Sequence, residues 1–184
     1  MTWIDLIPIV LIIGYGVLGY FTGVIRRLAG LVALYAAFVA ATNMGLQAGS
    51  ILQSSSAVAT PDSRIYSFFG LVFFILLVVE GAGQLVHNQI QLQAIVFNRA
   101  SGAVIGVLTA VVLSVLLTYE LQAAGNPTGG AQLDPLQQNI RDAINGSHLA
   151  IPLTNALEKP IVSIFDPVLP GDPQIYFGPG PVNP

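Results

Sequence analysis

The segment from Trp3 to Arg27 limits the possible folds more than any other part of the chain. It reads WIDLIPIVLIIGYGVLGYFTGVIRR, and its one charged side chain before the two final arginines is Asp5. A helix of about 20 apolar residues is about 30 Å long, which matches the thickness of the hydrocarbon core of a membrane. The segment therefore predicts a transmembrane helix over about residues 4–23, followed by a basic anchor at its far end.

Composition extends this prediction to the whole chain. Only 8% of the 184 residues are charged and 54% are hydrophobic, whereas soluble domains carry about 25% charged residues. The absence of cysteine excludes disulfides, thiolate metal sites and cysteine nucleophiles. The six basic residues are scattered, so the sequence gives no electrostatic reason to expect nucleic acid as a partner.

Three further apolar runs predict an all-α membrane protein with four transmembrane helices in residues 1–124. The additional spans are expected at about residues 28–45, 65–87 and 102–121. The small, polar stretch 45–62 contains Pro61 and is predicted to be a loop, which could include a short interfacial helix around Ile51 and Leu52. Residues 88–101 are predicted to form the connector before the last span.

Residues 125–184 have a different character and are predicted to form an extramembrane, Pro-rich, partly helical tail. They hold ten of the twelve prolines. A short helix is expected over residues 135–144, with Asp134 as its N-cap, and a second over about 147–157. The final residues are expected to be extended. The tail has too many apolar residues for a linker, so it should bury them against the bundle, the bilayer or a partner protein.

The distribution of arginines predicts the topology. Arg26 and Arg27 lie in the first turn between spans, and Arg99 lies in the connector before the last span. Because basic residues favour the cytoplasmic side, these three act as topology anchors and both termini are expected outside, in the periplasm or extracellular space.

Several short motifs resemble the colicin V production protein family of bacterial inner-membrane proteins. They are the opening Trp3-Ile-Asp5, the Gly19-x-x-x-Gly23 step followed by paired arginines, and Asn98-Arg99-Ala-Ser-Gly102 with Gly106 after it. The resemblance covers about residues 1–121. It departs near Thr109, where a basic residue is usual, and in the Pro-rich tail. It implies a four-helix inner-membrane protein linked to bacteriocin production or secretion and to envelope homeostasis, without a defined biochemical activity.

Glu80 is the intramembrane polar residue with the clearest functional potential, because an ionised carboxylate inside a span is expensive. It could relay protons, with Arg99 or His87 as its partner, or serve as a structural group in the bundle. Metal binding by His87 or His148 is not expected, since no further ligands stand at a suitable spacing. We expect no catalytic residues, no cofactor and no metal.

Glycines at a spacing of four are expected to let helices pack closely. The pairs are Gly19 with Gly23 and Gly102 with Gly106. Such pairs allow close helix contact in lipid. The contact could lie within the bundle, or it could join a second copy or a larger complex.

The sequence favours a non-enzymatic helper, a scaffold for secretion and envelope maintenance in the bacterial cytoplasmic membrane. Two alternatives stay open: an accessory subunit of a respiratory or photosynthetic membrane complex, and a small transporter or channel component that uses Glu80. The expected partners are the lipid bilayer and other membrane proteins.

Overall fold

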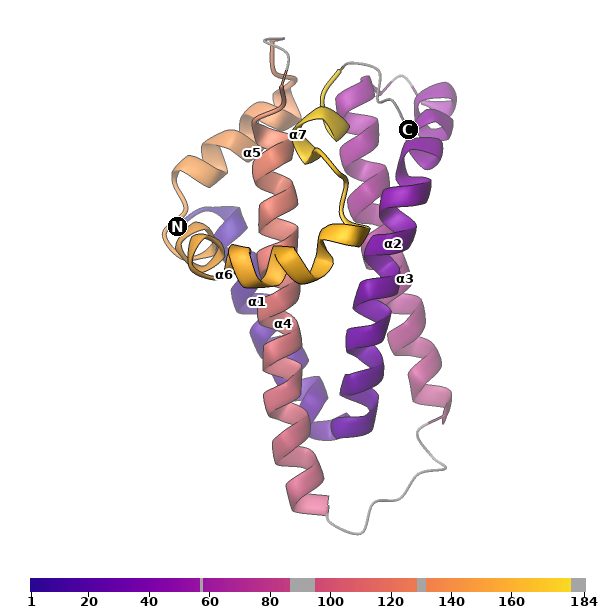
Figure 1. The fold of residues 1–184 in the computed structure, drawn as a ribbon, viewed down its shortest axis with the longest axis vertical. Helices are drawn as coiled ribbons and strands as arrows, with labels where there is room; N and C mark the ends of the chain where they lie inside the picture. Colours follow the sequence, from indigo (N-terminus) through magenta and orange to yellow (C-terminus); the bar gives the residue numbers. More distant parts are fainter. Residues whose placement is uncertain (57, 87–94, 129–131, 180–184) are drawn as a thin grey trace.

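The computed structural model describes residues 1–56, 58–86, 95–128 and 132–179, which fold into helices joined by turns and short connections (Figure 1). Within these residues four helices are long and apolar enough to cross a membrane, which confirms the predicted all-α membrane fold. In chain order the elements are α1 (Trp3–Thr22), α2 (Val24–Ser55), α3 (Thr60–Val86), α4 (Ile95–Gly125), α5 (Pro135–Asn145), α6 (Ala150–Phe165), the 3-10 helix η2 (Asp166–Val168) and α7 (Pro173–Tyr176).

The long helices form two antiparallel pairs, α1 with α4 and α2 with α3 (Figure 1). The pairs meet mainly where α2 contacts α4. The N-terminus and α5–α7 lie in the half of the bundle where α2 and α4 end and α3 begins, which we name the tail end. The opposite end, where α1 passes into α2 and where α4 begins, carries Arg26, Arg27 and Arg99 and is named the arginine end.

The prediction of a loop over residues 45–62 is wrong. Helix α2 continues to Ser55, and α3 begins at Thr60. The small residues form a packing face, since a Cβ at Gly49 would lie 3.1 Å from Ser67 Oγ of α3. Pro61 falls in the first turn of α3, where a missing amide donor costs little. The small and polar residues of this stretch, which are typical of loops, here form the contact between the end of α2 and the start of α3.

The predicted connector over residues 88–101 is also shorter than expected, because α4 is helical from Ile95. Residues 88–94 of that connector lie outside the described residues. The same holds for residue 87, the last residue of the predicted third span; α3 ends at Val86.

The tail contains more helix than predicted. Helix α5 confirms the predicted helix and its N-cap, with Asp134 and Gln137 forming a capping box. Helix α6 occupies the place of the second predicted helix but begins at Ala150 and continues to Phe165. The expectation of an extended chain from residue 166 onward is wrong over residues 166–168, which form η2, and over residues 173–176, which form α7.

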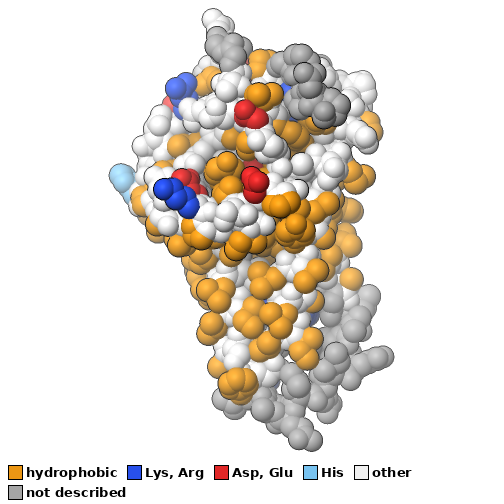
Figure 2. Space-filling view, viewed as in Figure 1, with side chains coloured by type: hydrophobic (Ala, Val, Ile, Leu, Met, Phe, Trp, Pro, Cys, Tyr) orange, Lys and Arg blue, Asp and Glu red, His pale blue; other side chains and the backbone are white. Residues whose placement is uncertain are grey.

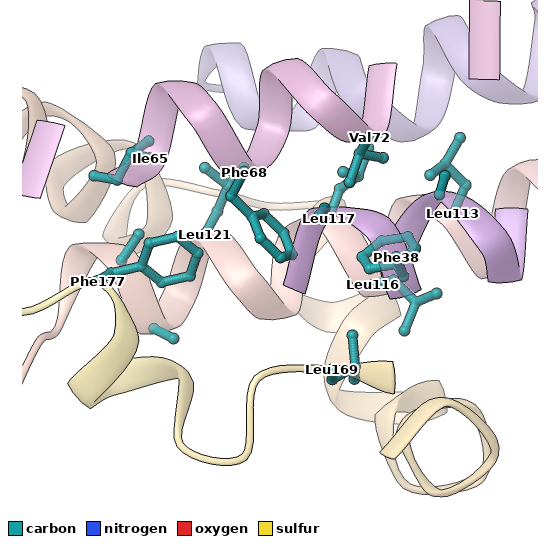
Figure 3. Close-up of a cluster of buried hydrophobic side chains, with 14 of the residues drawn as sticks. Phe38, Ile65, Phe68, Val72, Leu113, Leu116, Leu117, Leu121, Leu169 and Phe177 are labelled. Atoms are coloured by element: carbon teal, nitrogen blue, oxygen red, sulfur yellow. The ribbon is translucent and has the colours of Figure 1, made fainter. Parts of the chain in front are cut away.

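The tail packs into the core of the bundle at the tail end. Phe68 of α3 lies at its centre, with ring centroids 6.0 Å from Phe38 of α2, 5.5 Å from Phe177 and 5.7 Å from Tyr176 (Figure 3). Phe177 is fully buried. Leu117 of α4 lies in the same cluster. The tail is therefore an integral part of the fold at this end.

Candidate functional site

The candidate site is an ion pair at the arginine end, between Arg27 of α2 and Glu80 of α3. The guanidinium binds the carboxylate through two hydrogen bonds, Nη1 to Oε1 at 2.9 Å and Nη2 to Oε2 at 3.2 Å. The Arg27 side chain is 1% exposed and that of Glu80 is 23% exposed. Such a bidentate contact fixes geometry as well as neutralising charge, and an intramembrane charge normally needs such a partner.

Arg27 also connects this pair to α1. Its Nε donates a hydrogen bond to Thr22 Oγ1 at 3.1 Å, and its guanidinium lies 5.3 Å from the centre of the Tyr15 ring. The Arg27 side chain therefore contacts both α1 and α3. One residue joins three helices at the arginine end.

Two neighbouring residues complete the site. Arg26 donates to the backbone oxygen of Glu80 and lies 3.5 Å from its Oε2. Gly30, one turn beyond Arg27 on α2, faces the carboxylate, and a Cβ there would lie 3.6 Å from Glu80 Oε1, in ordinary van der Waals contact. The arrangement is suited to holding helices together, because every polar atom of the acid faces an arginine.

The partner of Glu80 differs from the prediction. Arg99 is exposed and lies over the ring of Tyr20, 5.8 Å from its centre, while residue 87 lies outside the described residues. Arg26 and Arg27, which the sequence predicts as topology anchors, are the residues that pair with Glu80. The sequence carries no local signal for this pairing, because Glu80 lies 53 residues from Arg27 on another helix.

The glycines predicted to pack helices all lie at the crossing of α1 and α4. A Cβ at Gly19 would collide with the backbone of Gly102, and a Cβ at Gly106 would collide with the backbone of Tyr15. A Cβ at Gly102 would meet the backbone of Gly23. The structure therefore places both glycine pairs in one contact inside the molecule, where the two backbones touch.

Asn98 joins this crossing to the start of α2. Its Oδ1 accepts a hydrogen bond of 2.9 Å from the backbone amide of Val24, a donor that the helix itself leaves free. The residue before, Gly23, has a φ of 78° and leaves no space for a Cβ beside the Asn98 side chain. The chain therefore turns between α1 and α2 through a single glycine.

A second polar site lies at the tail end, around the fully buried Asp5. Its carboxylate accepts hydrogen bonds from Ser147 Oγ at 2.5 Å, from the amides of Leu149 at 3.0 Å and Ala150 at 3.1 Å, and from the amide of Thr2 at 3.0 Å. Asp5 thus acts as the N-terminal cap of α6, a helix about 145 residues away in sequence. Sequence reasoning missed this role, although an acid in the first turn of an apolar span was a signal.

Trp3 makes a related contact, because its Nε1 donates to Asn139 Oδ1 of α5 at 3.0 Å. Trp3 and Asp5, the first and last residues of the Trp3-Ile-Asp5 motif, therefore both join α1 to the tail.

Glu120 is a further acid, in the last turns of α4. It is fully buried in α4, and among the described residues neither of its carboxylate oxygens has a hydrogen-bond partner. Within the same part of the chain no three His, Asp or Glu side chains come together as a metal site requires.

Comparison with family models matches residues 4–158 to the model described as Colicin V production protein. The matched range includes α1 from its second residue, all of α2–α5 and the first half of α6. Comparisons with curated proteins and with solved structures gave no match.

Proposed function

The chain belongs to the colicin V production protein family of membrane proteins, and on this basis we propose that it is a non-enzymatic scaffold that supports secretion and envelope maintenance. We place it in the bacterial cytoplasmic membrane as a multi-pass protein. Its partners in this proposal are other membrane proteins in a larger complex.

A scaffold is supported by the contacts of the polar side chains, which join one segment of the chain to another. Arg27 and Glu80 join α2 to α3, Asn98 caps α2, and Asp5 caps α6. Each of these groups is used in a contact between segments of the chain. A scaffold needs such fixed joints, whereas catalysis needs a reactive group that faces a substrate.

The glycine contact affects which kind of partner we propose. Gly19, Gly23, Gly102 and Gly106 are all covered by the α1–α4 crossing. A second copy of the chain therefore has no access to these glycines in the folded bundle. A partner would instead contact the exposed apolar faces of the long helices, which include Val32, Phe74 and Leu77.

We further propose that the arginine end faces the cytoplasm and that both termini lie in the periplasm. The arginine end carries Arg26, Arg27 and Arg99 close to span ends, which is the pattern that favours cytoplasmic placement. An impermeant thiol reagent applied to intact spheroplasts should label Lys159→Cys and spare Arg99→Cys.

Photo-crosslinking in the native membrane tests the scaffold proposal. A photoreactive residue is placed in turn at Val32, Phe74 and Leu77 and, as controls at the tail end, at Gln138 and Asn155, all of which are exposed. We expect one face to give a repeated protein adduct. Cells lacking the gene should lose tolerance to detergent stress, and wild-type protein should restore it.

Lipid adducts alone at every position, with tolerance still restored, would contradict the scaffold. An adduct to a respiratory or photosynthetic enzyme would instead identify an accessory subunit. Truncation after Gly125 is a poor test, because it removes Phe165 and Phe177 from the core and so damages the fold itself.

A further inference from the structure

We propose that α6 is an interfacial helix that lies in the membrane surface at the tail end, with one flank in the acyl chains of that leaflet. The tail is then partly embedded in lipid rather than wholly extramembrane.

The depth of α6 is set by α1. Helix α1 has 20 residues and is about 30 Å long, so its two ends mark the two surfaces of the hydrocarbon core. The first turn of α6 is bonded to Asp5 in the first turn of α1, through the amides of Leu149 and Ala150. Helix α6 therefore begins at the level of one membrane surface.

The direction of α6 is across the long helices rather than along them (Figure 1). It starts at α1 and packs on α4. It ends against α2, where the ring of Phe165 lies 5.6 Å from Tyr35 and 6.2 Å from Phe38. Because α6 begins at the level of one membrane surface and crosses the spans instead of running along them, it lies closer to the plane of that surface than to the direction of the spans.

One flank of α6 is apolar and partly uncovered. Leu149, Leu153, Leu157, Pro160 and Ile164 follow one another at steps of four, four, three and four, which places them along one edge of the helix. Ile164 is 66% exposed and Leu149 is 38% exposed. An uncovered apolar edge of this length needs an apolar environment.

The other flank is polar. Glu158, Lys159 and Asp166 line a hollow together with Tyr119, which lies near the tail end of α4. On the face shown in Figure 2, the charged side chains gather at and above α6, toward α5 and α7. Hydrophobic side chains gather along its other edge and over the spans below it. The apolar edge thus continues the lipid-facing surface of the bundle.

These features are those of a helix that lies about 5–10 Å into the boundary between headgroups and acyl chains. The acids and the lysine of the polar flank carry a net charge of about −1, so attraction to anionic lipid is not the driving force. The driving force is instead the burial of the apolar edge, and zwitterionic lipid should therefore suffice as the partner.

Single cysteines test the proposal, because the natural chain has none. Pro160→Cys and Ile164→Cys place a thiol on the apolar flank; Asn155→Cys and Lys159→Cys are the matched polar-flank variants. All four positions are exposed and four residues apart within each pair. Each variant is labelled with an environment-sensitive fluorophore and reconstituted in phosphatidylcholine vesicles, with and without phosphatidylglycerol.

We expect phosphatidylcholine that carries a nitroxide near the top of its acyl chain to quench the apolar-flank labels several-fold more strongly than the polar-flank labels. Aqueous iodide should show the reverse order, and phosphatidylglycerol should change neither. Equal quenching of all four labels by iodide would overturn the proposal. Protection of the apolar flank from both quenchers would also overturn it, because a second copy or another protein would then cover the flank.

Discussion

The two ends of the bundle are held together by different kinds of contact. At the arginine end, three charged side chains and one asparagine join the helices, and the backbones of α1 and α4 touch. At the tail end, a cluster of aromatic rings fills the space between α2, α3 and the tail, and a buried carboxylate caps α6.

This difference indicates how each end should respond to substitution. The contacts of the arginine end depend on single atoms with strict geometry, and a charge left without its partner there is costly. The tail end spreads its stabilisation over many apolar contacts, so the loss of one group leaves the others in place. We therefore expect the largest effects at the arginine end and smaller, more local effects at the tail end.

The strongest test of this asymmetry is the α1–α4 crossing. Gly19→Leu places a side chain where the backbone of Gly102 lies, and we expect a cost above about 5 kcal/mol, enough to abolish the folded state. Gly14→Leu on the same helix is the control, because its Cβ would meet no described atom within 4 Å. Thermal unfolding in detergent measures both; equal stability of the two variants would contradict the crossing.

The next effect should come from the ion pair. Arg27→Leu removes the bidentate partner of Glu80 and leaves Arg26 as the remaining arginine beside the carboxylate, so we expect a loss of about 3 kcal/mol in the free energy of unfolding. Arg99→Leu is the matched control, since Arg99 is exposed and lies over Tyr20. A stable Arg27→Leu protein would show that the pair contributes little to the bundle.

The tail end should respond more locally. Asp5→Ala removes the cap of α6, and we expect a loss of about 2 kcal/mol. Hydrogen exchange should rise at the amides of Leu149 and Ala150 while α3 stays protected. Asp142→Ala, on the exposed face of α5, is the control. Faster exchange throughout the bundle would mean that the two ends are not separate.

The smallest effect comes from a double-mutant cycle in the aromatic cluster. A Cβ at Gly45 would collide with Tyr176 Oη but would lie 3.6 Å from Cζ of the same ring. Gly45→Ala should therefore cost about 1–2 kcal/mol in the natural chain. In the Tyr176→Phe background it should cost almost nothing. If the effects of the two substitutions were additive, the Tyr176 hydroxyl would not lie against Gly45.

The apolar helices could be predicted because the reason for them is local. A span must satisfy its backbone amides within itself, so a run of apolar residues is sufficient evidence for it. The same reasoning predicts the wrong structure for the stretch 45–62, because Gly and Ser are frequent both in loops and in helices that pack closely together. The contact between Gly49 and Ser67 decides between the two, and it lies in the tertiary structure.

The candidate site was predicted in part for a similar reason. Glu80 stood out by its own chemistry, but its partner is 53 residues away on another helix. Asp5 and its contacts with α6, and the burial of Phe177, depend on how the tail folds back. Motif residues could be noticed in the sequence, whereas the pairs that they form required the structure.

The central claim is that the intramembrane charges are joints of a scaffold rather than carriers of protons. Exchanging the pair in the double variant Arg27→Glu, Glu80→Arg tests it most directly. If the pair is a joint, the exchange should recover much of the stability lost in Arg27→Leu and restore detergent tolerance to cells that lack the gene. A double variant that folds stably in the membrane but restores no tolerance would contradict the claim, because the acid at position 80 would then have a chemical role of its own.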